Sequence, residues 1–134
     1  MSNSIATGVA YNDPEFSTVY ATAEIGYAAS AQGTATQATS KSTGVTLNAS
    51  SGQITMNNAA LGATTNVAFT LTNSSITAKD VIIFNVAGGN ATAGTYNVFT
   101  STLAAGSATV VLRNISGGSL SEAVVLNYAI IHAQ

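Results

Sequence analysis

The chain has 134 residues and a mass of 13.3 kDa, a size that fits one domain with one hydrophobic core. It has no cysteine and one histidine, which excludes cysteine nucleophiles and redox pairs and leaves too few ligands for the usual thiolate and imidazole metal sites. Charged residues make up 6% of the chain, three basic and five acidic, against about 25% in an average soluble protein.

So few charges leave uncharged surface patches as large as one side of a standard protein interface, about 800 Å². We therefore expect the protein to work inside an assembly. The alternative is a monomer kept soluble by its many Ser, Thr and Asn side chains. The basic residues Lys41, Lys79 and Arg113 form no cluster, so we expect no nucleic-acid partner. The longest apolar runs, residues 81–84 and 123–126, are far shorter than the roughly 18 residues that span a bilayer, and we expect no membrane partner.

Residues 1–42 are predicted to form an extended N-terminal arm and linker. They contain the only proline and three of the five tyrosines, and they lack a sustained apolar period. The stretch 31–40 is small, polar and of low complexity, which favours an extended or flexible connector. The alternative is that residues 18–25, rich in β-branched and aromatic side chains, form an integral strand.

Aromatic rings of the arm are the candidate assembly contacts. Such amphipathic side chains concentrate at binding hot spots, and the arm lacks the alternation that would bury them in a sheet. An extended segment of about 30 residues, the part of the arm that holds these rings, can reach up to about 100 Å, enough to cross to neighbouring subunits. The four candidates are Tyr11, Phe16, Tyr20 and Tyr27.

Residues 43–134 are predicted to form one β-sandwich domain. Large apolar side chains alternate with small or polar ones over residues 66–72, as a half-buried strand requires. Residues 81–86 and 123–131 are apolar on both faces, which is typical of a strand that lies between two layers or is covered by another subunit. Further strand patterns, separated by turn residues, lie at 45–47, 54–56, 95–101 and 108–115.

Strands of this number and spacing, about seven or eight, indicate an all-β fold: an antiparallel β-sandwich, jelly-roll-like or a related barrel, with the extended N-terminal arm in front of it.

Few ionisable side chains are available for catalysis. Asp13 and Glu15 flank Pro14, which favours a turn or an extended arm over a glycosidase pair. His132 follows two isoleucines in the last strand pattern, with no Ser or Asp motif to orient it, so a structural or interface role is favoured over a general base. We therefore expect no enzyme, no catalytic residue, no metal and no cofactor.

Four segments carry a resemblance to a known family. They read TSKSTGVTLN at 39–48, SGQITM at 51–56, FTLTN at 69–73 and GGSLSEAVVLN at 117–127. These blocks resemble a family of small proteins encoded in tailed-phage and prophage genomes, usually among virion structural genes. The resemblance extends over about residues 33–132. It implies a virion component. The N-terminal residues 1–6 show no basic region before an apolar one, so we expect synthesis in the host cytoplasm.

Small size, low charge and the predicted sandwich lead from a virion component to a capsid decoration, or cement, protein on the capsid exterior. We expect a homotrimer that binds the major capsid protein non-covalently and stabilises the shell. The alternative function is a head- or tail-fibre module that recognises a host-surface glycan, in which Tyr96 or Tyr128 could contact the sugar.

Overall fold

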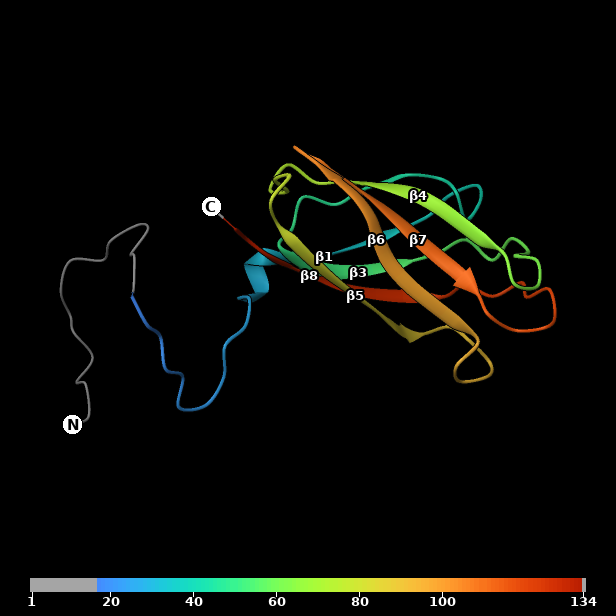
Figure 1. Ribbon diagram of the computed structural model, residues 1–134, viewed down its shortest axis with the longest axis horizontal. Helices are drawn as coiled ribbons and strands as arrows, with labels where there is room; N and C mark the ends of the chain where they lie inside the picture. The colour runs from blue at the N-terminus through green and yellow to red at the C-terminus, as the bar shows by residue number, and fades with distance from the viewer. Residues whose placement is uncertain (1–16, 134) are drawn as a thin grey trace.

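The computed structural model describes residues 17–133, which form a β-sandwich preceded by an extended segment (Figure 1). A 3₁₀ turn, η1 (Ala29–Ala31), leads into the first strand. Over residues 17–133 there is no helix long and apolar enough to cross a membrane. The all-β sandwich predicted from the sequence is confirmed. Its strands are β1 (Gln32–Thr36), β2 (Val45–Thr46), β3 (Ser51–Thr55), β4 (Asn66–Thr72), β5 (Val81–Gly88), β6 (Tyr96–Ala104), β7 (Ser107–Asn114) and β8 (Val125–Ile131).

The strands form two four-stranded sheets, in the orders β1-β3-β8-β5 and β2-β4-β7-β6. We call them sheet A and sheet B. The central strand β8 pairs antiparallel with β3 and β5, and β7 pairs antiparallel with β4 and β6. In contrast, β1 and β3 are parallel, as are β2 and β4. The sheets are therefore mixed, a difference from the wholly antiparallel, jelly-roll-like pairing that we predicted.

The parallel pairs have a simple origin in the path of the chain. From β1 to β4 the chain changes sheet at every connection. A parallel pair needs a crossover connection, and here each crossover contains a strand of the opposite sheet. The chain thus crosses between the sheets from β1 to β4, and the remaining pairs are antiparallel, with β6 and β7 forming a hairpin.

The core lies between the sheets and follows the predicted alternation. On β4, Phe69 and Leu71 point inward and Thr70 points outward. On β8, Leu126 and Ile130 face them from sheet A. Burying one side chain of this size stabilises the fold by about 1.5–3 kcal/mol. The largest fully buried apolar side chains are Ile54, Met56, Leu71, Leu112, Leu126, Ile130, Val110 and Val124.

The sandwich begins earlier than the predicted division into 1–42 and 43–134. Residues 32–36 form β1, which pairs with β3 along its whole length. This low-complexity stretch forms a strand because its small residues allow close approach: a Cβ on Gly33 would lie 2.7 Å from Leu47 Cδ1. The following loop is also part of the body, since Gln37 is buried and its Nε2 donates to the carbonyls of Lys41 and Thr43, both at 2.9 Å.

Residues 17–28 form no strand or helix, and every one of them is exposed. We call this segment the arm. It runs away from the sandwich (Figure 1), so the alternative of an integral strand at 18–25 is wrong. Two contacts hold its end against the body: the Tyr27 hydroxyl donates to the carbonyl of Ile130, and Gln32 Nε2 donates to the carbonyl of Tyr27 at 2.9 Å.

Candidate assembly surface

The outer face of sheet A has an apolar end. Val81 and Ile83 on β5 and Ile131 on β8 point away from the core and are 54%, 54% and 55% exposed. Val81 lies opposite Ile131, and Ile83 lies opposite Ala129, so the four side chains are neighbours on one face. We call Val81, Ile83, Ala129 and Ile131 the β5–β8 patch.

The position of β5 explains why these residues are exposed. The run 81–86 is apolar on both faces, yet β5 lies at the edge of sheet A, and within residues 17–133 no layer covers its outer side. Natural edge strands are normally protected by charges, proline or bulges near the edge. Strand β5 contains no charged residue and no proline, and its one irregularity lies at its far end, between Val86 and Gly88.

The rest of this face is polar but uncharged. Gln53 Nε2 donates to Asn127 Oδ1 at 3.0 Å across β3 and β8. None of the strands β1, β3, β5 and β8 contains a charged residue. A shallow hollow of about 530 Å³ lies on this part of the face, lined by Gln32, Gly33, Thr34, Ser51, Gly52, Gln53, Asn127 and Tyr128.

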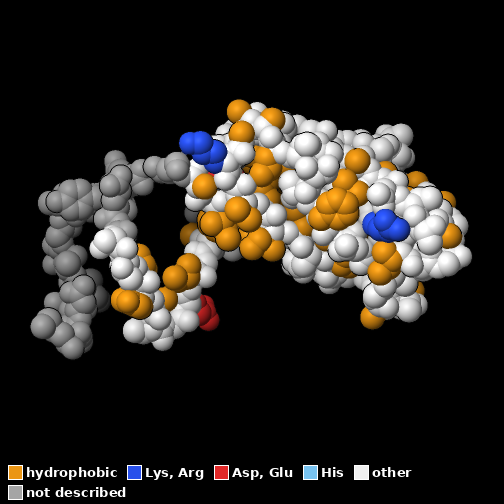
Figure 2. All heavy atoms as spheres, viewed as in Figure 1, with side chains coloured by type: hydrophobic (Ala, Val, Ile, Leu, Met, Phe, Trp, Pro, Cys, Tyr) orange, Lys and Arg blue, Asp and Glu red, His pale blue; other side chains and the backbone are white. Residues whose placement is uncertain are grey.

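The arm adds further unburied apolar groups. Tyr20 is 90% exposed, and Val19 and Ile25 are also mostly exposed. Ile25, Gly26 and Tyr27 line a hollow of about 530 Å³ together with residues 129–132 of the body. Figure 2 shows the hydrophobic side chains of the arm and those on the end of the body next to it. The base of the arm is therefore beside the β5–β8 patch.

The predicted contact residues have different outcomes. Tyr20 and Tyr27 are exposed on the arm, as an assembly contact requires, and Tyr27 also binds the body. Tyr11 and Phe16 lie outside the described residues. Sequence reasoning about the arm missed Val19 and Ile25, which are aliphatic. It also did not name the β5–β8 patch as a site, although the two-faced apolar run at 81–86 was the signal for it.

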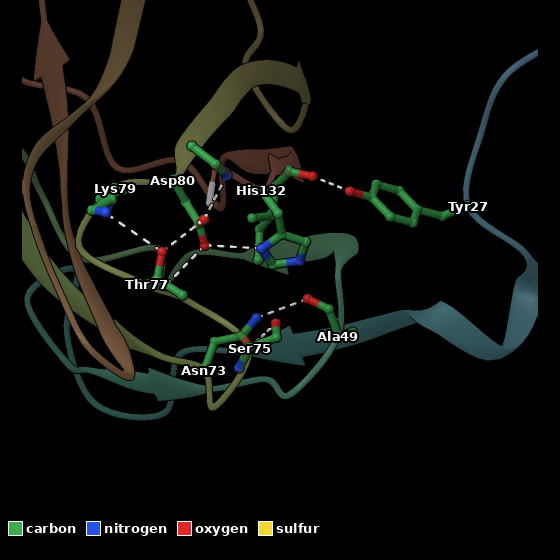
Figure 3. Close-up of polar contacts among 10 residues, drawn as sticks. Tyr27, Ala49, Asn73, Ser75, Thr77, Lys79, Asp80 and His132 are labelled. Carbon is green, nitrogen blue, oxygen red and sulfur yellow. Dashed lines mark hydrogen bonds and ion pairs between the residues drawn. The ribbon is translucent and has the colours of Figure 1, made fainter. Parts of the chain in front are cut away.

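A polar cluster closes the end of sheet A next to the patch (Figure 3). The buried carboxylate of Asp80 accepts hydrogen bonds from the backbone N–H and hydroxyl of Thr77, both at 2.8 Å, and from the backbone N–H of Ala133 at 3.2 Å. Its Oδ2 lies 3.0 Å from His132 Nδ1. The Thr77 N–H is the main cause that lowers the pKa of Asp80 to about 2, with help from the Thr77 hydroxyl, Ala133 and His132.

This contact gives His132 a structural position, since it fixes the end of β8 to the turn before β5. The sequence predicted a structural or interface histidine here, and the Asp80 partner could not be seen from it. Within residues 17–133, no group of three or more His, Cys, Asp or Glu side chains is arranged to hold a metal ion.

A second polar cluster surrounds the buried ammonium of Lys41. The ammonium of Lys41 is buried and donates to the backbone carbonyls of Asn57 and Glu122. Burial lowers the pKa of Lys41, and the Glu122 carboxylate opposes that shift. Glu122 Oε1 accepts from the Ala91 N–H at 2.7 Å, and burial, with the same carboxylate nearby, raises the pKa of Tyr96. These groups join four loops of the body, those that contain Lys41, Asn57, Ala91 and Glu122.

The two clusters leave very little charge on the surface. Asp80 and Lys41 are buried, and Glu122 is partly buried and hydrogen-bonded. The exposed charged side chains of the described chain are Glu24 on the arm, Lys79 in the turn before β5, and Arg113 on β7. Across residues 17–133, the contact between His132 and Asp80 is the one pair of basic and acidic side chains within 4 Å of each other.

Tyr96 and Tyr128, the predicted sugar contacts of the alternative function, are both buried. The Tyr128 ring packs on Phe84 with 5.5 Å between ring centroids, and its hydroxyl donates to the Ala49 carbonyl at 2.8 Å. Neither ring stands exposed as a stacking surface for a sugar, although Tyr128 lies in the lining of the hollow over β1, β3 and β8. Both tyrosines pack in the core because they lie on the inward-facing side of their strands.

Comparison with known proteins adds no assignment: no family model, no curated protein and no solved structure matches this chain. The resemblance to phage virion proteins therefore stays a prediction from the sequence.

Proposed function

We propose that this protein is a structural component of a phage virion, a capsid decoration protein that binds the major capsid protein shell and stabilises it without covalent chemistry. The observation that carries the proposal is the uncharged sheet A, with half-exposed aliphatic side chains on an edge strand. A monomer gains nothing from leaving Val81, Ile83 and Ile131 in water, whereas an assembly protein can bury them against a partner.

The physical basis of attachment is apolar burial. Each Å² of apolar surface removed from water contributes about 25 cal/mol, and association costs reduce that gain. A decoration protein repeats the same contact over a shell, so that several modest contacts of one oligomer act together. A homotrimer would present the uncharged outer face of sheet A three times at once, while the β5–β8 patch and the arm hold its copies together.

Binding to shells tests this proposal directly. Shells assembled from the major capsid protein of the same genome are mixed with the protein and sedimented, and the bound fraction is measured over a concentration series. We compare wild type with Ile83→Lys, in the β5–β8 patch, and with Thr70→Lys, an exposed outward position on β4 of sheet B. The expected result is saturable binding that Ile83→Lys weakens at least tenfold and Thr70→Lys leaves unchanged.

Equal effects of the two lysines would contradict the assignment of the surface. If wild-type protein does not sediment with shells at any concentration, the decoration function is overturned. Because both substitutions add the same charge to an exposed strand position, this comparison separates the location of the lysine from its chemistry.

One observation favours the second candidate, a fibre module that binds a host glycan. The hollow over β1, β3 and β8 is lined by amides and hydroxyls, including Gln53 and Asn127, which are suitable hydrogen-bond partners for neutral sugars. Binding to a glycan array that Asn127→Ala abolishes, together with no binding to shells, would favour this function over decoration.

A further inference from the structure

We propose that the arm of one copy lies across the β5–β8 patch of a second copy, with Glu24 of the first beside Lys79 of the second. This contact describes how copies of the protein associate with one another. It rests on the proposed function only because that function includes a homo-oligomer. It is tested on the isolated protein, so it can fail while binding to shells persists, and shell binding can fail while this contact persists.

Both partners of the contact expose matching apolar groups. The arm exposes Val19, Tyr20 and Ile25, and the patch exposes Val81, Ile83 and Ile131. The two sets are the main concentrations of large exposed apolar side chains in the described chain. The others are Tyr27 at the base of the arm, Phe99 in sheet B and Ile115 in the loop after β7. Burying the two sets against each other removes both from water.

Charge complementarity fixes the orientation. Glu24 is the one acidic residue of the arm and is exposed. On the body, Asp80 is already bound to His132, and Lys41 is buried near Glu122. The bases left at the surface are Lys79 and Arg113. Lys79 lies two residues before Val81 at the edge of the patch, whereas Arg113 lies on β7 in the outer face of sheet B. Lys79 is therefore the base that an arm on the patch can reach.

The direction of the arm favours a second copy over the arm's own body. Tyr27 is held at Ile130, residues 24–28 contain no turn or bend, and the arm bends farther from the body, at residues 22 and 23. Gly26 has nothing within 4 Å of the position a Cβ would occupy. From Tyr27 the arm leads away from the sandwich (Figure 1), and its ten preceding described residues reach about 33 Å when extended. Each copy then gives one arm and receives one, which allows a closed symmetric oligomer.

Disulfide trapping tests the contact with single thiols. The chain has no cysteine, so Glu24→Cys and Lys79→Cys each carry one. The two variants, one with a mass tag, are mixed under mild oxidation, and heterodimer formation is followed on non-reducing gels. A disulfide requires Cα atoms within about 7 Å. We expect this pair to cross-link at least five times faster than the matched pair of Glu24→Cys with Arg113→Cys. Equal rates for the two pairs would overturn the proposal.

The same residues distinguish exchange from folding back. If the double variant E24C/K79C forms a disulfide within one chain at a rate independent of concentration, and the mixed single variants give no heterodimer, the arm covers its own patch and exchange is overturned.

Charge reversal provides an independent readout in the absence of thiols. In sedimentation velocity, Glu24→Lys is expected to weaken self-association by about two- to fivefold, the range of an exposed ion pair. Adding Lys79→Glu to it should restore wild-type association, and adding Arg113→Glu should not. Rescue by Arg113→Glu, or a wild-type protein that sediments as a 13.3 kDa monomer at every concentration, would overturn the proposal.

Discussion

The two outer faces of the sandwich differ in the side chains that they present to solvent. On sheet B, the outward positions of β4 are Asn66, Ala68, Thr70 and Thr72, small or polar groups that water solvates well. The outward Val111 of β7 is buried, and it lies opposite Phe99 of β6. Arg113 adds a charge to this face.

The β5 edge of sheet A carries outward aliphatic side chains and no charge, in contrast to sheet B. Its outward aliphatic side chains remain half exposed, and the sheet has no charge to keep other chains away. Because the fold and the alternation are the same in both sheets, the difference lies in which side chains fill the outward positions. Sheet B can face solvent alone, and the β5 end of sheet A is suited to a partner.

The largest effect on stability should come from substitutions in the core between the two sheets. Leu126→Ala on β8 and Leu112→Ala on β7 each remove a fully buried side chain, and each should lower the free energy of unfolding by about 2–5 kcal/mol. Asn127→Ala, the outward neighbour of Leu126, should change it by at most about 0.5 kcal/mol. Urea unfolding followed by circular dichroism measures all three. A loss at Asn127 as large as that at Leu126 would mean that the outer face of sheet A is not exposed as described.

The next largest effect on stability should come from Asn114, the buried asparagine at the end of β7. Asn114 Nδ2 donates to the carbonyls of Leu61, Gly62 and Gly118 at 2.8–3.0 Å. Asn114→Ala removes these three bonds and also leaves the Ser116 N–H, which donates to Asn114 Oδ1 at 2.9 Å, without its acceptor. It should cost about 1–3 kcal/mol of unfolding free energy. Asn90→Ala, in an exposed loop where Asn90 Nδ2 binds only the Thr92 carbonyl, is the matched control and should cost less than about 0.5 kcal/mol. The prediction fails if the two variants have equal urea midpoints.

Acid should loosen the end of sheet A that carries the patch. The folded pKa of Asp80 is about 2, below its ordinary value of 3.8, so its contribution to stability is present above about pH 4 and is lost as the pH falls through 2. Asp80→Asn removes this linkage. The urea midpoint of wild type should therefore fall more steeply than that of Asp80→Asn between pH 4 and pH 2. Parallel curves for the two proteins would show that Asp80 does not contribute in this way.

The smallest effect should be that of salt on attachment. With three exposed charged side chains in the described chain, few contacts can be screened, so raising NaCl from about 50 mM to about 500 mM should change binding to shells by no more than about twofold. Release of most of the protein in co-sedimentation at the higher salt would show that charged contacts dominate.

The parts of the fold that sequence could predict were those with a local pattern. The alternation at 66–72 predicted which side chains of β4 face the core, and the run 81–86 predicted β5. Sequence could not predict β1, because its partner β3 is not its neighbour in the chain and the pair depends on close approach at Gly33. The small, polar composition of this stretch instead favoured a flexible linker.

The candidate site was predictable only in part for the same reason. Aromatic residues marked the arm, yet the β5–β8 patch needs the register of two strands that are distant in sequence. The contact of His132 with Asp80 joins residues 52 positions apart, and no local motif predicts it. The patch also depends on β5 being an edge strand, which follows from strand order and not from the residues of β5.

The most direct test of the central claim is a chain that begins at Ala29, compared with the full chain for folding and for binding to shells. The deletion removes the arm and leaves every strand in place. We predict an unchanged β-type circular dichroism spectrum, a mass that falls from about three times 13.3 kDa toward a single chain, and loss of co-sedimentation. A truncated protein that remains a trimer and binds shells as well as the full chain would contradict the account.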